Sequence, residues 1–188
     1  MLKYIEEYEK YVETTGFRNV KIEATAEFLN AIRKEQQQNT VVQFFNAGLV
    51  ASWQHLYFAV LNALMAFNNK RNISKSVAIE VMLYASAQRQ IRKAIDLIGV
   101  KRDSAQVAVV IVGESPSSVK AVLSAVSKRV GKEPDETVLE LSKEKMLSVR
   151  RAFGISEKEL ETVMEKNNIE QALVDLVIER MALLSTQL

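Results

Sequence analysis

The chain of 188 residues contains no cysteine, and this absence removes several kinds of chemistry. A disulfide framework, a zinc site with thiolate ligands and a thiol nucleophile all require that residue. No stretch of about 18 apolar residues occurs, so we expect no membrane span. Charges at Lys3, Glu6 and Glu7 come too early for a secretion signal. We therefore expect a cytoplasmic protein.

Histidine is almost as scarce, and this limits the catalytic sites that the chain can build. His55 is the only histidine, and it lies in the apolar segment 53–58. A zinc site would need several carboxylates to converge on this imidazole, and a Ser-His-Asp triad would need an acid to orient it. The nearest acids in the sequence are Glu35 and Glu80. We interpret His55 as a structural or partner-facing residue, and we expect no enzymatic activity, catalytic residue, metal site or cofactor.

The composition, with 48% apolar and 26% charged residues, is that of an ordinary globular protein. The length suits one domain, which we predict over residues 1–188. We predict two short strands within residues 2–22 and a third over residues 41–45. Residues 107–112 form a run of six apolar residues, mostly Val and Ile, which is typical of a central strand.

Capping residues mark the predicted helices. These cover residues 26–34 after Thr25, residues 52–67 from Ser52, residues from Ser74 or Ser76 to Ile98, and residues 115–130 with Pro116 in the first turn. Three more helices are predicted near the end of the chain. The middle one begins at Ser156 with Glu159 completing a capping box, and the last covers residues 169–184. Because strands and helices do not alternate regularly, we predict an α+β fold, with several helices packed on a small mixed or antiparallel sheet.

The junction at residues 113–117 is the one place where a phosphate site is conceivable from the sequence. A helix that begins after Gly113 exposes backbone N–H groups able to hold an anion. A phosphate loop, however, needs several glycines and a lysine, and this segment has one glycine, no lysine and a repelling Glu114. An ordinary helix cap is the simpler interpretation, and a phosphate-binding enzyme with its site at Gly113–Ser117 stays an alternative.

Basic residues concentrate between positions 70 and 102. Eight of them stand against two acids there, so the segment carries a net charge of +6 in a chain whose total is +2. The basic residues are Lys70, Arg71, Lys75, Arg89, Arg92, Lys93, Lys101 and Arg102. Such a zone either binds an anionic partner or forms a solvated helix face, and charge alone does not decide between the two.

The helix predicted to reach Ile98 contains an unusual acid. Glu80 stands among Ile79, Val81 and Met82, and a salt bridge or a nearby backbone N–H would satisfy it. On one continuous helix Glu80, Tyr84 and Gln88 would share a line. The apolar residues predicted to face the core are Ile79, Met82, Leu83, Ile91, Ile95 and Ile98.

Two segments of this region resemble a known family. Residues 73–76, Ile-Ser-Lys-Ser, and residues 80–91, Glu-Val-Met-Leu-Tyr-Ala-Ser-Ala-Gln-Arg-Gln-Ile, resemble the hallmark helix of the kinase-binding small subunit of the KEOPS complex, in its archaeal form. The likeness extends to residues 16–21, 42–47, 55–57, 107–114 and 177–184, and so covers nearly the whole chain. Residues 115–166 match least.

The resemblance implies a non-catalytic subunit that supports threonylcarbamoylation of a tRNA adenosine. It implies two partners, which are the small atypical kinase-fold ATPase of that complex and the single-stranded CCA end of tRNA. It implies no membrane partner and no small-molecule substrate.

We predict the RNA-binding residues from the resemblance together with the chemistry of single-stranded RNA. Its phosphates need cations, and its bases need flat or apolar surfaces. The predicted cations are Lys70, Arg71, Lys75, Arg89 and Arg92, and the predicted lining residues are Tyr84, Gln90 and Ile91. Lys75 and Ile91 lie in the matched motif, whereas Lys70, Arg71 and Lys93 rest on charge alone. Burial in the core is the other interpretation of Ile91.

The last predicted helix has more apolar residues than one face of a surface helix holds. We expect the additional apolar side chains to be buried in the core or against a partner. The resemblance favours a kinase contact through Ile178, Met181, Leu183 and Leu184. On this interpretation Leu184→Glu abolishes kinase binding and leaves the fold intact. The alternative to the whole hypothesis is a structural adaptor that binds the kinase and no RNA.

Overall fold

The contacts within the chain divide it into two compact units, each made of two stretches. The computed structural model describes residues 1–20 and 39–186. The first unit comprises Met1–Ala47 and Gly99–Leu139, and the second comprises Gly48–Ile98 and Glu140–Leu188. The helix expected over residues 26–34 lies outside the described residues. The single domain expected from the length stays a prediction.

The sheet belongs to the first unit. Its strands are β1 (Leu2–Ile5), β2 (Lys10–Arg18), β3 (Val41–Asn46) and β4 (Gln106–Gly113). Their order is β1-β2-β4-β3, and every neighbouring pair is antiparallel. The run of Val and Ile at 107–112 is therefore central, as predicted, because β4 pairs with β2 on one side and β3 on the other. The three strand predictions at residues 2–22 and 41–45 are also confirmed, and η1 (Glu6–Tyr8) separates β1 from β2.

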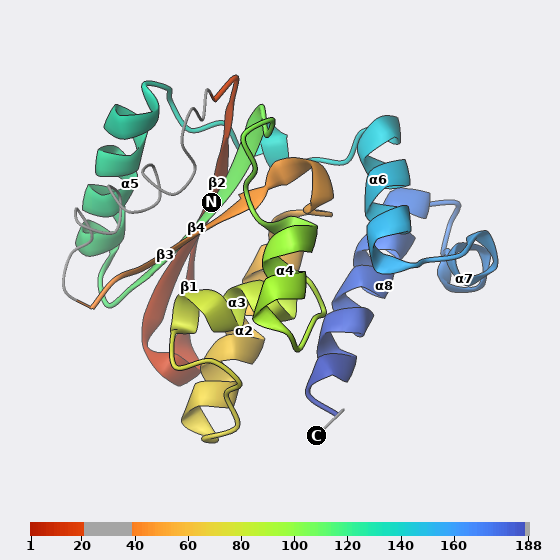
Figure 1. Cartoon of the computed structure of the whole chain (residues 1–188), viewed down its shortest axis with the longest axis horizontal. Coiled ribbons are helices and arrows are strands. Elements are labelled where there is room, and N and C mark those ends of the chain that lie inside the picture. Colours follow the sequence, from red (N-terminus) through yellow and green to blue (C-terminus); the bar gives the residue numbers. More distant parts are fainter. Residues whose placement is uncertain (21–38, 187–188) are drawn as a thin grey trace. The chain divides into compact units, whose positions relative to one another are not determined.

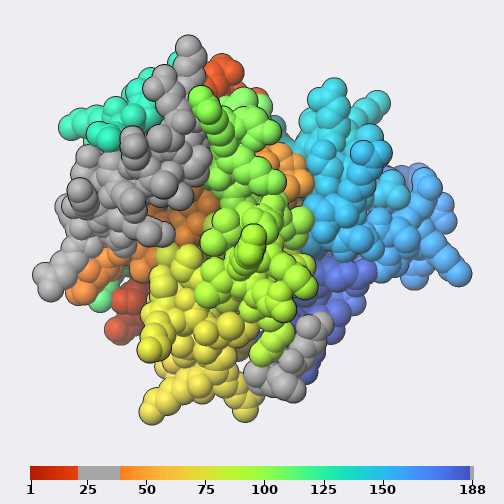
Figure 2. All heavy atoms as spheres, in the orientation of Figure 1, coloured from red at the N-terminus to blue at the C-terminus, as the bar shows by residue number. Residues whose placement is uncertain are grey.

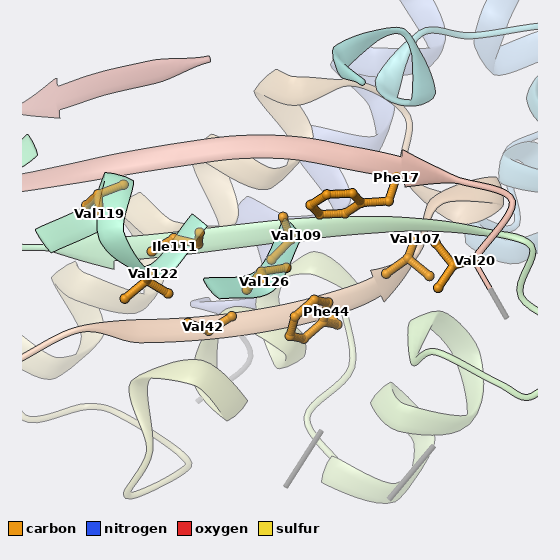
Figure 3. Close-up of a cluster of buried hydrophobic side chains, with 10 residues drawn as sticks. All are labelled: Phe17, Val20, Val42, Phe44, Val107, Val109, Ile111, Val119, Val122 and Val126. Atoms are coloured by element: carbon orange, nitrogen blue, oxygen red, sulfur yellow. The ribbon is translucent and has the colours of Figure 1, made fainter. Parts of the chain in front are cut away.

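Helix α5 (Pro116–Val130) packs on one face of this sheet (Figure 3). Side chains alternate between the two faces of a strand, so every second residue of β4 points toward the helix. The buried cluster consists of Phe17, Val20, Val42, Phe44, Val107, Val109, Ile111, Val119, Val122 and Val126. Ser115 caps the helix in a capping box with Ser118, and Pro116 follows it, as predicted.

Close packing explains the glycine in the middle of β2. A Cβ on Gly16 would lie 2.7 Å from Cγ1 of Val138, in η3 (Glu136–Leu139), and 3.0 Å from the carbonyl oxygen of Val107. The absence of a side chain therefore lets η3 lie directly against the strand.

The second unit is helical in its described residues (Figure 1). Its elements are η2 (Ala47–Leu49, shared with the first unit), α2 (Trp53–Asn68), α3 (Val77–Ala85), α4 (Ile91–Ile98), α6 (Lys143–Phe153), α7 (Glu157–Val163) and α8 (Ile169–Leu184). Helix α8 contacts α2, α3, α6 and α7. The predicted caps at Ser52 and Ser156 are confirmed, as is the α+β fold with an antiparallel sheet.

The predicted helix that ends at Ile98 is wrong in one respect, because it breaks into α3 and α4. Ala87 adopts a left-handed conformation with φ of 51°. The backbone N–H of Ala87 donates to the carbonyl of Tyr84, and that of Gln88 donates to the carbonyl of Leu83, at 2.9 and 3.0 Å. This pair of bonds is the Schellman motif, which ends a helix by satisfying its last carbonyls.

The break changes which side chains face outward. Ile91 and Ile95, expected in the core, are 43% and 45% exposed, and Figure 2 shows α4 on the surface of its unit. Gln88 lies beyond the end of α3 and does not share a line with Glu80 and Tyr84. The core prediction holds for Met82, Leu83 and Ile98 and fails for Ile91 and Ile95, and Ile79 is half-buried.

His55 is structural. Its ring is fully buried near the start of α2. Its Nδ1 accepts a hydrogen bond from the backbone N–H of Ala51 at 3.1 Å, so Nε2 carries the proton and donates to the carbonyl of Ala85 at 2.7 Å. Burial lowers the pKa of His55 to about 4, the bond to Ala85 opposes this shift, and the charge of Lys145 adds to it. The imidazole is therefore a neutral bridge between the start of α2 and the end of α3.

A buried neutral histidine makes the stability of the protein depend on pH. The folded pKa of about 4 lies below the ordinary 6.5, so the unfolded chain binds the proton more tightly. The free energy of unfolding is unaffected by this group above pH 6.5 and falls as the pH drops from there toward 4. We expect His55 to account for a loss of about 2 kcal/mol between pH 7 and pH 5.

Urea unfolding of the wild type and of His55→Gln at the two pH values measures this loss, since the carboxylates titrate alike in both. We expect a flatter pH dependence in the variant. NMR provides a second measurement, because the single imidazole signal of the folded wild type should not shift between pH 7 and 5. A signal that titrates near pH 6.5 would contradict a neutral buried ring.

Candidate functional site

The second unit contains a cavity of about 470 Å³ between helix ends. The end of α2 and the loop that follows it form one side, the end of α3 forms another, and the end of α8 and the residues after it close the third. The lining residues are Met65, Ala66, Asn69, Arg71, Ile73, Tyr84, Arg89, Leu184, Ser185 and Thr186.

The lining combines cations with apolar surfaces. Arg71 and Arg89 are exposed at the cavity, and none of the described residues that line it carries a carboxylate. Met65 and Ile73 are partly exposed apolar side chains. A site of this composition suits an anion that carries a flat or apolar group, because the guanidinium groups bind phosphate oxygens and the apolar side chains contact the rest.

A helix end positions Arg71. Lys70 adopts a left-handed conformation with φ of 55°, and its backbone N–H donates to the carbonyl of Phe67 at 3.1 Å. The backbone N–H of Arg71 donates to the carbonyl of Ala66 at 2.8 Å. This is a second Schellman motif, so α2 and α3 end in the same way. In each case an arginine of the cavity follows the left-handed residue by one or two positions.

Glu80 holds the loop between α2 and α3. Its carboxylate is fully buried and accepts the backbone N–H of Ile73 at 3.1 Å and that of Ser74 at 2.7 Å. The hydroxyl of Ser74 in turn accepts the N–H of Ser76. The sequence interpretation of Glu80, an acid satisfied by nearby backbone, is confirmed. Its hydrogen bonds fix the segment that presents Ile73 to the cavity.

Tyr84 forms part of the wall on α3. Its side chain is buried, and burial together with the charge of Glu80 raises the pKa of its phenol, whereas Arg89 opposes the shift. The hydroxyl therefore stays protonated at neutral pH and acts as a hydrogen-bond donor or acceptor at the cavity.

Of the eight predicted RNA-binding residues, the structure brings three together at this cavity: Arg71, Tyr84 and Arg89. The other five do not line it. They are Lys70, Lys75, Gln90, Ile91 and Arg92, and all are exposed on the loop or at the start of α4. Their contribution to RNA binding stays a prediction, and the exposure of Ile91 removes the core interpretation of that residue.

Several lining residues were not predicted from the sequence. Met65 and Asn69 lie at the end of α2, and Ser185 and Thr186 follow α8, so they come from parts of the chain far from the matched motif. Ile73 belongs to that motif and was a usable signal. The remaining positions carry no local signal, since only the packing of α8 against α2 and α3 places them here.

The predicted kinase-binding residues divide into two groups. Met181 and Leu184 are buried, and Leu184 is only 3% exposed, whereas Leu183 is 41% exposed and Ile178 is half-buried. Leu184 also lines the cavity. The expectation that Leu184→Glu leaves the fold intact is therefore wrong, because the substitution would place a carboxylate on a buried position.

The helix start at residues 115–118 is an ordinary cap. The hydroxyl of Ser115 accepts the N–H of Ser118, and Glu114 pairs with Lys10 at 3.0 Å. A Cβ on Gly113 would lie 2.9 Å from both Ser118 and Val119, so this glycine serves close packing. Among the described residues no group of acids, histidines or cysteines is arranged to hold a metal ion. None of the helices in residues 1–20 and 39–186 has the length and the apolar character of a membrane span.

The role of Glu80 in the loop can be tested with Glu80→Gln. One oxygen of Glu80 accepts from both Ile73 and Ser74, and the other accepts from Ile73 alone. The glutamine keeps the shape but replaces one of these oxygens with an NH₂ group, so a hydrogen bond is lost and a donor faces the N–H of Ile73 or Ser74. We expect a loss of about 1–3 kcal/mol in the free energy of unfolding, and faster hydrogen exchange at both amides. The exposed Glu157→Gln serves as the control and should change neither. Unchanged exchange in Glu80→Gln would show that the loop does not need this carboxylate.

Comparison with known proteins agrees with the sequence motifs. A family model described as "Kinase binding protein CGI-121" matches residues 17–185. The "Regulatory protein Cgi121" of Methanocaldococcus jannaschii is 32% identical over 134 residues, which cover 71% of this chain and 83% of that protein. Since the family match covers most of the chain and the relative is covered over most of its length, the chain belongs to the CGI-121 family of kinase-binding proteins.

Proposed function

We propose that the chain is a non-catalytic regulatory subunit that binds a small kinase-fold ATPase and grips the single-stranded CCA end of tRNA, and so supports threonylcarbamoylation of the tRNA. The observation that carries the RNA part is the cavity between the ends of α2, α3 and α8. The family match supports the kinase part.

The cavity suits a single-stranded end better than a duplex. Its volume of about 470 Å³ is that of a pocket for a small group of atoms, so an unpaired nucleotide can enter it and a double helix cannot. Single-stranded RNA is recognised through unstacked bases on apolar or aromatic side chains and through cations on its phosphates. Met65, Ile73 and Tyr84 provide the first kind of surface, and Arg71 and Arg89 provide the cations.

The turns at the end of α8 support the kinase part. Leu183 and its neighbour Ala182 are exposed, and Ile178 is half-buried one turn earlier on the helix. A helix that presents exposed apolar side chains in this way suits a groove on a partner. Met181 and Leu184 are buried, so they pack the helix against its own unit and do not contact the partner.

Arg71→Gln tests the RNA part. Removal of one phosphate contact should weaken binding of intact tRNA about 5- to 10-fold and lower the slope of log K against log salt by about 1. Filter binding over a salt series measures both quantities. Arg151→Gln, which removes an exposed arginine of α6, is the control with the same change in net charge.

The same assay with tRNA that lacks its CCA end completes the test. We expect the wild type to lose most of its affinity for the shortened tRNA. Equal binding of the two tRNAs, or an equal effect of Arg71→Gln and Arg151→Gln, would contradict a specific site. Absence of any RNA binding beside intact kinase binding would leave the structural adaptor as the function.

Two adjacent leucines test the kinase part. Leu183→Glu places a charge on an exposed position, so we expect unchanged thermal stability and loss of co-purification with the kinase-fold ATPase. Leu184→Glu places the same charge in the interior, where it should destabilise the chain by several kcal/mol.

Leu147→Glu is the matched control, because Leu147 is a 52% exposed leucine on α6. It should alter neither stability nor kinase binding. A Leu183→Glu protein that is folded and still binds the kinase would move the interface away from the end of α8.

A further inference from the structure

The first unit carries a hollow of about 560 Å³ beside the outer side of α5. Val119, Val122 and Val126 face the sheet and do not line the hollow, which lies on another side of α5 and reaches Leu123 at the edge of the core. Its polar lining consists of Lys120, Ser124, Ser127, Lys128, Lys132 and Glu133.

A well-braced turn forms the far wall of the hollow. Helix α5 ends where Gly131 adopts a left-handed conformation with φ of 67° and donates its N–H to the carbonyl of Ser127 at 2.8 Å. Further along the turn, the N–H of Asp135 donates to the carbonyl of Gly16, and the carboxylate of Asp135 pairs with Arg18 at 2.6 Å. Because β2 holds the turn on this side, the hollow is present before any ligand binds.

Among the described residues that line the hollow, three lysines stand against one carboxylate. Helix α5 contains no acidic residue, and Glu133 is the only carboxylate among the described residues that line the hollow. None of the three lysines makes a salt bridge in the part of the chain that the structure describes. Elsewhere in this unit Lys10 and Arg18 are both paired. The hollow is therefore a local excess of positive charge.

The helix dipole does not account for this charge. Cations in the last turn of a helix are stabilised by the negative partial charge at its C-terminus. This effect is enough to explain the presence of Lys128 in the last turn of α5. Lys120 stands in the second turn, near the positive end of the helix dipole, so it gains nothing from that effect.

The spacing of the lysines favours a polymer of phosphates over one phosphate ion. Lys120 and Lys128 are eight residues apart on one side of the helix, which corresponds to about 12 Å along its axis. A single phosphate cannot reach both, whereas successive phosphates of a nucleic-acid strand can. The serine hydroxyls between the lysines are further donors to phosphate oxygens.

From this arrangement we infer that the hollow on α5 binds the phosphate backbone of the tRNA body, as a contact that does not read sequence. The inference rests on the RNA part of the proposed function. It adds a second contact, made through charge and hydroxyl groups rather than through base surfaces, since only Leu123 and Pro134 provide apolar lining.

The test uses the full chain with Lys120→Gln, Lys128→Gln and Lys132→Gln combined. Binding of tRNA lacking its CCA end should fall roughly tenfold, and the slope of log K against log salt should decrease by about 2 to 3. The control carries Lys143→Gln, Lys158→Gln and Lys166→Gln, which remove three exposed lysines of the second unit and the same total charge. It should bind as the wild type does.

Glu133→Lys gives a measurement that misfolding cannot imitate. It should raise the affinity for the shortened tRNA several-fold and increase the salt slope by about 1. Wild-type affinity in the α5 triple variant, or no gain with Glu133→Lys, would overturn the inference. Polyglutamate serves as a second probe, and an effect of the triple variant on polyglutamate alone would assign the hollow to an acidic protein instead.

The outcome separates this inference from the proposed function. If the α5 triple variant weakens both tRNAs equally while removal of the CCA end has no effect, the hollow binds RNA and the cavity does not. If removal of the CCA end abolishes binding and the triple variant is normal, the cavity binds RNA and the hollow does not.

Discussion

The candidate cavity depends on how two helices satisfy their last carbonyl groups. Both α2 and α3 end in a Schellman motif. The left-handed residue is Lys70 after α2 and Ala87 after α3, and neither is glycine. A left-handed conformation costs about 1 kcal/mol or more in residues with a Cβ, so the surrounding contacts have to impose it. The carboxylate of Glu80 and the ring of His55 supply such contacts, because the first fixes the loop after α2 and the second binds the last residue of α3. Arg71 and Arg89 come one and two residues after these left-handed residues, so the two helix ends set their positions.

Local signals explain why so many boundaries could be predicted from the sequence. Ser52, Ser115 and Ser156 each begin a helix with a side-chain oxygen that accepts a backbone N–H, and Gly131 ends α5 in a left-handed conformation. These effects act over three or four residues, so the sequence suffices to find them. The run of Val and Ile in β4 likewise predicted a strand paired on both sides.

The break between α3 and α4 could not be predicted for the opposite reason. Ala87 is an excellent helix former, and nothing in its own chemistry favours a left-handed conformation. Tertiary contacts determine the break, and the exposure of Ile91 and Ile95 follows from it. An apolar residue at helical spacing was therefore a poor guide to burial here. The structure does bring two of the predicted cations, Arg71 and Arg89, to one cavity.

The end of α8 illustrates what sequence reasoning lacks at a surface. Its excess of apolar residues correctly indicated more than one buried face, but the sequence does not say which leucine faces which way. The structure turns Leu184 inward, where it lines the cavity, and leaves Leu183 exposed. On the proposed function the RNA contact and the kinase contact then involve adjacent residues in the last turn of the helix. A kinase held by Leu183 would therefore lie beside the cavity that Leu184, Ser185 and Thr186 line, so a change in the last turn of α8 is expected to affect the binding of both partners.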